Sequence, residues 1–210
     1  MVYLYVHRRK KSKDEHVRQR DLFLEREIAR LNQNELFHAT SEFSDTNIIG
    51  SRRKAMVYSG RLNISAREQA VDLKRFRDEI AGSESLITEI RALVVTKHCN
   101  LVLLLGYCWD SRAMALVMEM MSNRTLAEHI QEKRLNWSRC LRITRGVAEG
   151  LKYLHHKCPQ PVLHCDLKPS NILLAMDFEP RIIDFGISRI LNYDDMSHRF
   201  STSNLHGSIG

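Results

Sequence analysis

The hydrophobic periodicity of the sequence changes near Asn123, and this change constrains the fold more than any other feature. Between Ile48 and Val117, short β-like runs alternate with turns, at residues 55–58, 69–76, 101–107 and 114–118. A helical stretch at about residues 83–94 interrupts them. Beyond Asn123, residues 137–156 repeat apolar side chains at helical spacing, and strand-like runs return at residues 162–163, 172–174 and 181–183. This order predicts an α+β fold with two lobes, a small β-rich lobe followed by a helical lobe.

The charge of the chain is concentrated at one end. The net charge is +7, and residues 1–20 hold seven Lys or Arg against two acidic residues, a net +5 that leaves only +2 for the other 190 residues. A basic tail on a nearly neutral body favours a membrane surface or a solubilising arm over a nucleic-acid-binding face. We therefore expect no nucleic-acid partner.

The five cysteines do not form a recognisable framework. Their number is odd and no two of them have the Cys-x-x-Cys spacing of a zinc site. Buried free thiols in a reducing cytosol fit this pattern best.

The first 35 residues are predicted to be a basic linker that lies next to a membrane. Six apolar residues open the chain and a Lys/Arg cluster follows at residues 8–13, an order opposite to that of a signal peptide. Six residues are too few to span a bilayer, but this order is typical of the cytoplasmic flank of a membrane helix. An unstructured start is the alternative. Residues 14–33 have loosely helical apolar spacing and are predicted to be a helical linker.

The main chemical motif is the run His164-Cys165-Asp166-Leu167-Lys168-Pro169-Ser170-Asn171, which is followed by Asp184-Phe185-Gly186. Phosphoryl transfer needs a carboxylate beside the attacking hydroxyl, a cation on the transferred phosphate, and oxygen ligands for Mg²⁺. Asp166 would orient the hydroxyl and accept its proton, and Lys168 would neutralise charge on the γ-phosphate. Asn171 and Asp184 would hold the metal. The run and the triplet match the catalytic loop and the metal-binding triplet of protein kinases, which the chain resembles here.

Further kinase positions follow from this resemblance. Lys74, at the end of Val71-Asp72-Leu73-Lys74, would contact the α- and β-phosphates of ATP, and Glu89 would pair with it from a helix. Read alone, either residue is more often a solvated surface charge. The segment 116–121 resembles the hinge between the lobes, where the backbone at Glu119 and Met121 would hydrogen-bond adenine; read alone, a Met-rich run is more often core packing. The resemblance thus implies ATP and Mg²⁺ as cofactors.

A narrower resemblance is to plant receptor-like kinases of the leucine-rich-repeat type, including the flagellin-sensing kinases. It covers about residues 36–210 and is carried by Phe37-x-Ala39-Thr40-x-x-Phe43-Ser44-x-x-Asn47-Ile48-Ile49-Gly50, Asn100-Leu101-Val102-x-Leu104-Leu105-Gly106-Tyr107, Gly150-Leu151-x-Tyr153-Leu154-His155 and Gly207-Ser208-Ile209-Gly210. It implies a small lobe at residues 36–121 and a partial large lobe at 122–210. It also implies phosphorylation of Ser or Thr in a protein substrate, a choice that Lys168 favours. The chain would lie on the cytoplasmic side of the plasma membrane as part of a receptor, or in the cytosol by itself.

Several positions depart from the kinase pattern. Only Gly50 and Val57 remain of the glycine-rich loop that covers the phosphates, while Arg52 and its basic neighbours could supply compensating charge. Asp72 replaces the alanine expected against adenine, where a carboxylate is costly unless it is paired or points to solvent. Cys165 replaces the arginine before the catalytic aspartate.

The sequence ends at Gly210, where the family continues with Tyr-x-Ala-Pro-Glu and further helices, so we expect a partial kinase domain with poor phosphotransfer. The alternative is a catalytically impaired pseudokinase or kinase fragment that acts as a binding module. Residues 184–210 are expected to be mobile.

Overall fold

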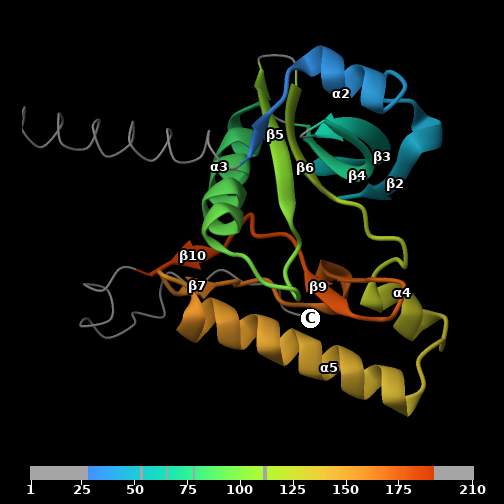
Figure 1. Cartoon of the computed structure of the whole chain (residues 1–210), viewed down its shortest axis with the longest axis vertical. Coiled ribbons are helices and arrows are strands. Elements are labelled where there is room, and N and C mark those ends of the chain that lie inside the picture. Colours follow the sequence, from blue (N-terminus) through green and yellow to red (C-terminus); the bar gives the residue numbers. More distant parts are fainter. Residues whose placement is uncertain (1–27, 53, 65, 78, 111–112, 192–210) are drawn as a thin grey trace, which may run out of the picture.

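The fold has two lobes, a β-sheet lobe stacked on a helical lobe (Figure 1). The computed structural model describes residues 28–52, 54–64, 66–77, 79–110 and 113–191. The predicted α+β two-lobed class is confirmed. The predictions for residues 1–27 and for the end of the chain after residue 191 lie outside the described residues. Within the described part of the chain, no helix is both long and apolar enough to cross a membrane.

The upper lobe is built on a six-stranded sheet in the order β1-β5-β6-β4-β3-β2. Its strands are β1 (Ala29–Arg30), β2 (Ile48–Ser51), β3 (Ala55–Ile64), β4 (Arg67–Phe76), β5 (Leu104–Asp110) and β6 (Ala113–Glu119). All neighbouring strands are antiparallel except β1 and β5, which are parallel. Residues 101–103 were predicted as strand but precede β5. The Val102 N–H donates to the Ile182 carbonyl of the lower lobe at 3.1 Å, so this segment connects the two lobes.

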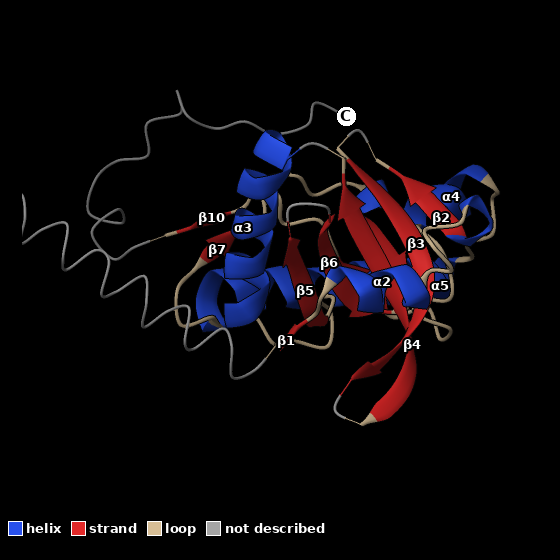
Figure 2. Ribbon diagram, turned by 90° about the horizontal axis from the view of Figure 1, so that it is seen from above, coloured by secondary structure: helices blue, strands red, loops and turns tan. Residues whose placement is uncertain are grey.

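Two helices cover the sheet. Helix α3 (Glu79–Val95) contacts β4, β5 and β6, and helix α2 (Gln33–Ala39) contacts β3. Seen from above, β5 and β6 lie between the two helices (Figure 2). Helix α2 begins with a reciprocal cap, in which the Asn32 side chain accepts from the Glu35 N–H at 3.0 Å and Glu35 accepts from the Asn32 N–H at 2.7 Å.

The predicted helical linker is wrong where the structure describes it. Residues Ala29–Arg30 form strand β1, paired with Gly106 and Tyr107 of β5. Gly106 permits this pairing, since a Cβ there would lie 2.8 Å from the Ala29 carbonyl oxygen. The local helical pattern is therefore overridden by a tertiary contact.

The lower lobe contains α4 (Leu126–Gln131) and the longer α5 (Trp137–Lys152), whose helical coil continues as one wider turn at Tyr153–Lys157. Two small antiparallel pairs lie between α5 and the sheet lobe, namely β7 (Val162–Leu163) with β10 (Arg189–Ile190) and β8 (Ile172–Leu174) with β9 (Pro180–Ile182) (Figure 1). A single 3₁₀ turn, Pro169–Asn171, leads into β8. These short pairs hold the loops that carry the predicted catalytic residues.

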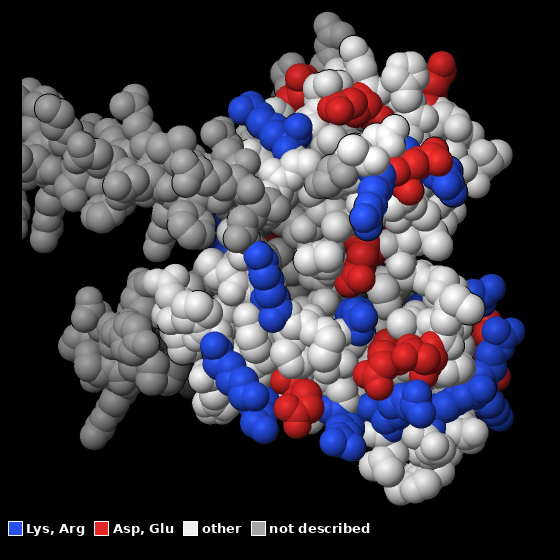
Figure 3. All heavy atoms as spheres, in the orientation of Figure 1, with Lys and Arg blue, Asp and Glu red and all other residues white. Residues whose placement is uncertain are grey.

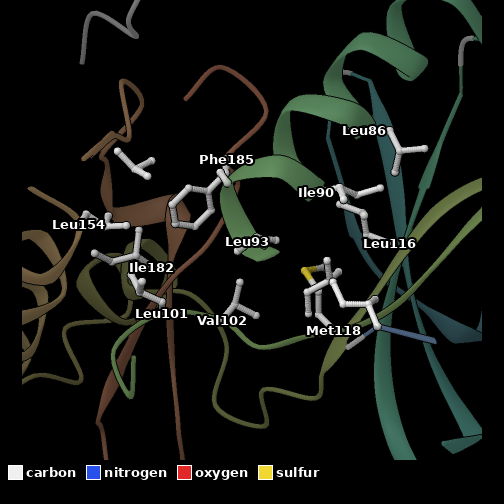
Figure 4. Packing of buried hydrophobic residues seen from close by; sticks show 14 of the residues in the cluster. Leu86, Ile90, Leu93, Leu101, Val102, Leu116, Met118, Leu154, Ile182 and Phe185 are labelled. Atoms are coloured by element: carbon white, nitrogen blue, oxygen red, sulfur yellow. The ribbon is translucent and has the colours of Figure 1, made fainter. Parts of the chain in front are cut away.

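One hydrophobic core crosses from lobe to lobe. It joins Leu86, Ile90 and Leu93 of α3 to Phe185 and Leu154 of the lower lobe, as Figure 4 shows. Phe185 and Leu154 have no exposed surface. A second core, around Leu36 of α2, fills the opposite face of the sheet. Because the first core is continuous, the two lobes pack at a defined separation, which fixes the space between them.

The outer surface carries charges of both signs. On the face drawn in Figure 3, Lys and Arg side chains are interspersed with Asp and Glu. A mixed surface of this kind produces little long-range attraction for a polyanion from this side.

Candidate active site

Two adjoining cavities open between the lobes. The first has a volume of about 640 Å³ and is lined by residues of both lobes, including Ile49, Val57, Met118 and Leu173. The second, about 610 Å³, is lined by the predicted catalytic residues Asp166, Lys168 and Asn171, among others. Arg52, Lys74 and Asp184 line both. Cavities of this size accommodate ligands as large as a nucleotide.

Lys74 is the charged centre that joins the two cavities. Its Nζ lies 2.7 Å from Glu89 Oε2 and 2.8 Å from Asp184 Oδ1. Strand β4 points the lysine inward, and α3 supplies the fully buried Glu89, so the predicted ion pair is present. Burial disfavours the ammonium form, but the two carboxylates outweigh burial and raise the pKa of Lys74. Burial also opposes ionisation of Asp184, but Lys74 outweighs it and lowers the pKa of Asp184. Burial raises the pKa of Glu89 against the opposing charge of Lys74, so the shifts favour the charged forms of Lys74 and Asp184 only.

His164 ties the catalytic loop to the Asp184 triplet. Its Nδ1 accepts the Asp166 N–H at 3.2 Å, and Nε2 lies 2.9 Å from the Ile183 carbonyl. Burial lowers the pKa of His164, so the ring is neutral, and with Nδ1 accepting, Nε2 carries the hydrogen and donates. The ring also contacts Phe185 edge-on, with centroids 4.8 Å apart. One buried imidazole thus positions both loops.

Asp166 is held by two neighbours from its own loop. The Asn171 amide nitrogen donates to Asp166 Oδ2 at 2.8 Å and to its backbone oxygen at 2.9 Å. Lys168 Nζ lies 2.9 Å from Asp166 Oδ2. The backbone is left-handed at Cys165 in this loop, where φ is 63°, and at Asp184 in the Asp-Phe-Gly triplet, where φ is 69°. Left-handed backbone is uncommon for residues other than glycine and concentrates at functional sites.

The second cavity offers oxygen ligands for a metal ion. Asn171 and Asp184, predicted to hold Mg²⁺, both line it. The described residues contain no cluster of three or more His, Cys, Asp or Glu that could hold a metal. Mg²⁺ commonly binds through one or two protein oxygens, with waters and substrate phosphates completing its shell. A carboxylate and an amide are the donor types for such a site, so the residues fit this metal.

The strand pair β2–β3 covers the first cavity. Gly50 pairs with Val57, and a Cβ on Gly50 would lie at an ordinary 3.6 Å from Val57 Cβ, so packing does not require glycine there. Arg52 extends from the turn across the cleft, where Nη2 donates to the Ser170 carbonyl at 2.8 Å. Its charge also contributes to the lowered pKa of Asp184. A guanidinium therefore lies in the cleft close to the catalytic loop.

Asp72 occupies an unexpected place at the other end of the first cavity. Its side chain is 5% exposed, and Oδ2 accepts the Met121 N–H at 3.2 Å. The other oxygen, Oδ1, is buried and has no hydrogen-bond partner among the described residues. Burial raises the pKa of Asp72 to about 6; the Met121 hydrogen bond opposes this shift and the charge of Glu119 adds to it. Glu119 also lines the cavity, and its N–H donates to the Leu103 carbonyl at 3.1 Å.

Comparison with models of protein families identifies the family of this chain. A family described as "Protein kinase domain" matches residues 43–206, most of the sequence. The chain belongs to the protein kinase family. Protein kinases use ATP with a divalent metal, in agreement with the cavities described above.

Comparison with individual curated proteins shows which kinases the chain resembles. The kinase is 36% identical over 184 residues to an L-type lectin-domain containing receptor kinase of Oryza sativa subsp. japonica, covering 86% of this chain and 27% of that protein. It is 37% identical over 163 residues to a probable serine/threonine-protein kinase of Arabidopsis thaliana, covering 74% and 42%. It is 34% identical over 171 residues to a probably inactive leucine-rich repeat receptor-like protein kinase of Arabidopsis thaliana, covering 79% and 27%. The predicted resemblance to plant receptor-like kinases is confirmed, and the chain spans less than half the length of these relatives.

The sequence motifs missed two contacts of this kinase. The cost of a carboxylate at Asp72 was expected, but its hydrogen bond to Met121, 49 residues away, was not. The charge of Arg52 was noted, but its contact with Ser170, 118 residues away, was not. No local pattern carries either signal, because both contacts exist only when the lobes are assembled.

Proposed function

We propose that the chain is a serine/threonine protein kinase domain that transfers the γ-phosphate of ATP to Ser or Thr hydroxyls of protein substrates. The observation that supports this most is the placement of Asp166 between Lys168 and Asn171, in a cavity shared with Lys74 and Asp184. Phosphoryl transfer depends mainly on positioning and on electrostatic stabilisation, and this cluster supplies both.

Each residue has a role in this proposal. Asp166 accepts the proton of the attacking hydroxyl and orients it, while Lys168, 2.9 Å from Asp166, stabilises charge on the transferred phosphate. Lys74, fixed by Glu89, contacts the α- and β-phosphates. Asn171 and Asp184 hold Mg²⁺, which neutralises phosphate charge when bound.

The first cavity would hold the nucleoside. In this proposal Gly50 and Val57 cover the nucleotide from β2 and β3, and the backbone at Glu119 and Met121 faces the base. Met121 has an intramolecular acceptor in Asp72, so a base that uses its N–H must displace that carboxylate. This competition is a physical reason to expect weak ATP binding and slow transfer.

The relatives and the sequence support a proposed placement in the cell. The sequence-based division is a basic juxtamembrane segment at residues 1–35, a small lobe at 36–121 and the large lobe from 122. Because Ala29–Arg30 pair with β5 and α2 begins at Gln33, we propose that the small lobe instead begins at β1. The kinase would act in receptor-like signalling on the cytoplasmic side of the plasma membrane, with a membrane tether upstream of the basic segment, or in the cytosol as this chain alone. The alternative of an impaired pseudokinase that only binds partners is not favoured by relatives named as serine/threonine kinases.

A substrate panel tests the proposed activity. The purified chain is incubated with radiolabelled ATP, Mg²⁺ and either a Ser/Thr-containing or a Tyr-containing peptide, beside the variant Asp166→Asn. We expect slow labelling of the Ser/Thr peptide alone, with a loss of about 100-fold or more in the variant, because a general base contributes on that order. Equal labelling by the variant, or labelling of the Tyr peptide only, would contradict the assignment.

A further inference from the structure

The turn that joins β2 to β3 is closed by its own backbone. The Arg52 N–H donates to the Ala55 carbonyl at 2.8 Å, and the Ala55 N–H donates to the Arg52 carbonyl at 3.4 Å. Both amides are therefore used inside the turn. In a glycine-rich phosphate loop, free backbone N–H groups face the phosphates instead. This turn needs another donor if it is to hold the phosphates of a nucleotide.

The Arg52 side chain is a donor that the turn places in the cleft. Its Nη2 donates to the Ser170 carbonyl at 2.8 Å, and Ser170 lies between Lys168 and Asn171 in the catalytic loop. A guanidinium has five N–H donors, and among the described residues this contact uses one of them. The Ser170 carbonyl thus fixes the guanidinium at the catalytic loop while its other donors stay available.

The charge of Arg52 is not balanced by a carboxylate. Among the described residues, Arg52 and Lys74 are the two cations that line both cavities. Lys74 is paired with Glu89 and Asp184, whereas Arg52 forms no ion pair within the described part of the chain. Arg52 therefore brings unpaired positive charge to the border between the nucleotide cavity and the catalytic residues, where the terminal phosphate of a bound nucleotide would lie.

We propose that Arg52 binds the γ-phosphate of ATP and stabilises its charge during transfer, in place of the backbone N–H groups of a glycine-rich loop. This proposal rests on the proposed kinase function and adds a catalytic residue to it. In the transfer, the Ser or Thr oxygen bonds to the γ-phosphorus, the bond from this phosphorus to the β,γ-bridging oxygen breaks, and the hydroxyl proton passes to Asp166. Arg52 stays protonated throughout and donates to the oxygens of the transferred group, over which the negative charge is spread.

Affinity for a mimic of the transferred phosphate tests this contact directly. Dissociation constants of ADP with Mg²⁺, in the presence and absence of aluminium fluoride, are measured by calorimetry for the wild-type chain, Arg52→Ala and Arg52→Gln. Because the nucleotide is the same, the ratio of the two constants reports on the phosphoryl mimic alone. We expect aluminium fluoride to tighten ADP binding to the wild type about tenfold or more, since a hydrogen bond from a charged donor is worth about that much. Both variants should lose most of this gain.

The glutamine variant separates phosphate binding from a structural link between the lobes. The amide of Arg52→Gln can still donate to the Ser170 carbonyl, but it carries no charge. Arg61→Ala removes an exposed arginine of β3 that lines neither cavity, and as the matched control it should leave the ratio unchanged. A wild-type ratio in Arg52→Gln, no tightening by aluminium fluoride in the wild type, or an equal loss in Arg61→Ala would each overturn the proposal.

Single-turnover phosphotransfer provides a second readout and separates this proposal from the proposed function. Arg52→Gln should slow transfer about 100-fold, because removing one donor to the charge of a transition state costs about that much. Asp166-dependent transfer at an unchanged rate in Arg52→Gln would overturn the role of Arg52 and leave the kinase activity standing. A loss of the aluminium fluoride gain in both variants, with no phosphotransfer by the wild type, would support the phosphate contact and overturn the kinase function.

Discussion

Replacing Asp72 by asparagine should stabilise the protein, and the gain should depend on pH. In the folded chain burial raises the pKa of Asp72 from 3.8 to about 6. The native state therefore binds more protons than the unfolded state between these values, and stability falls as pH rises through this window. A shift of this size corresponds to about 3 kcal/mol, at about 1.4 kcal/mol for each pKa unit.

Asparagine cannot ionise, and its amide oxygen can still accept the Met121 N–H. We expect Asp72→Asn to increase the free energy of unfolding by up to about 3 kcal/mol at pH 7.5, a gain that shrinks to about 1 kcal/mol at pH 4.5. The reason is that wild-type Asp72 is mostly protonated in the folded state at the lower pH, so the cost of burying its charge disappears.

Urea denaturation followed by circular dichroism at both pH values measures this difference. Glu68→Gln, which alters an exposed carboxylate on the same strand, serves as the control and should show no comparable gain. A gain for Asp72→Asn that is the same at pH 4.5 and 7.5, or a loss at pH 7.5, would refute the claim that Asp72 is buried in ionisable form beside Met121.

Three further perturbations follow from the contacts. Lys74→Met leaves the buried Glu89 without its cation and should cost about 3–5 kcal/mol of stability, which adding Glu89→Gln should partly restore, as denaturant melts will show. Arg52→Ala should weaken nucleotide binding in proportion to the number of phosphates, because its guanidinium lies at the catalytic end of the cleft. Calorimetry should show a loss of affinity for ATP and none for adenosine. Equal losses for both ligands would argue against phosphate contact. Gly186→Ala places a Cβ 2.6 Å from Ser85 Oγ and should cost about 1–3 kcal/mol, which Ser85→Ala should relieve; a thermal shift that Ser85→Ala does not change would exclude this clash.

The sequence predicted best the parts whose signal is local. The spacing from His164 to Gly186 sufficed to propose a shared site, and the structure places Asp166, Asn171 and Asp184 around one cavity. The apolar period of residues 137–156 predicted α5, although its last turn widens into a π-helical turn at Tyr153–Lys157.

Other parts depended on contacts between distant segments. Strand β1 exists because Ala29 and Arg30 pair with β5, which overrides the helical pattern of the preceding linker. Helix α2 was not predicted, although the Asn32 and Glu35 capping pair was a readable signal. Nothing near Asp72 in the sequence indicated its acceptance of the Met121 N–H, because that contact needs the end of β6 folded against β4.

We propose that the cleft is a working phosphotransfer site formed by Asp166, Lys168, Asn171, Asp184 and Lys74. The most direct test is single-turnover transfer of labelled γ-phosphate to a Ser/Thr peptide, in the presence and absence of Mg²⁺, by the wild-type chain and by Asp166→Asn. Nucleotide binding is measured in parallel for both proteins. We expect slow, Mg²⁺-dependent transfer by the wild type and a loss of about 100-fold or more in Asp166→Asn with unchanged nucleotide affinity. Transfer that is equally fast in both proteins, or absent from a wild-type chain saturated with nucleotide, would contradict it.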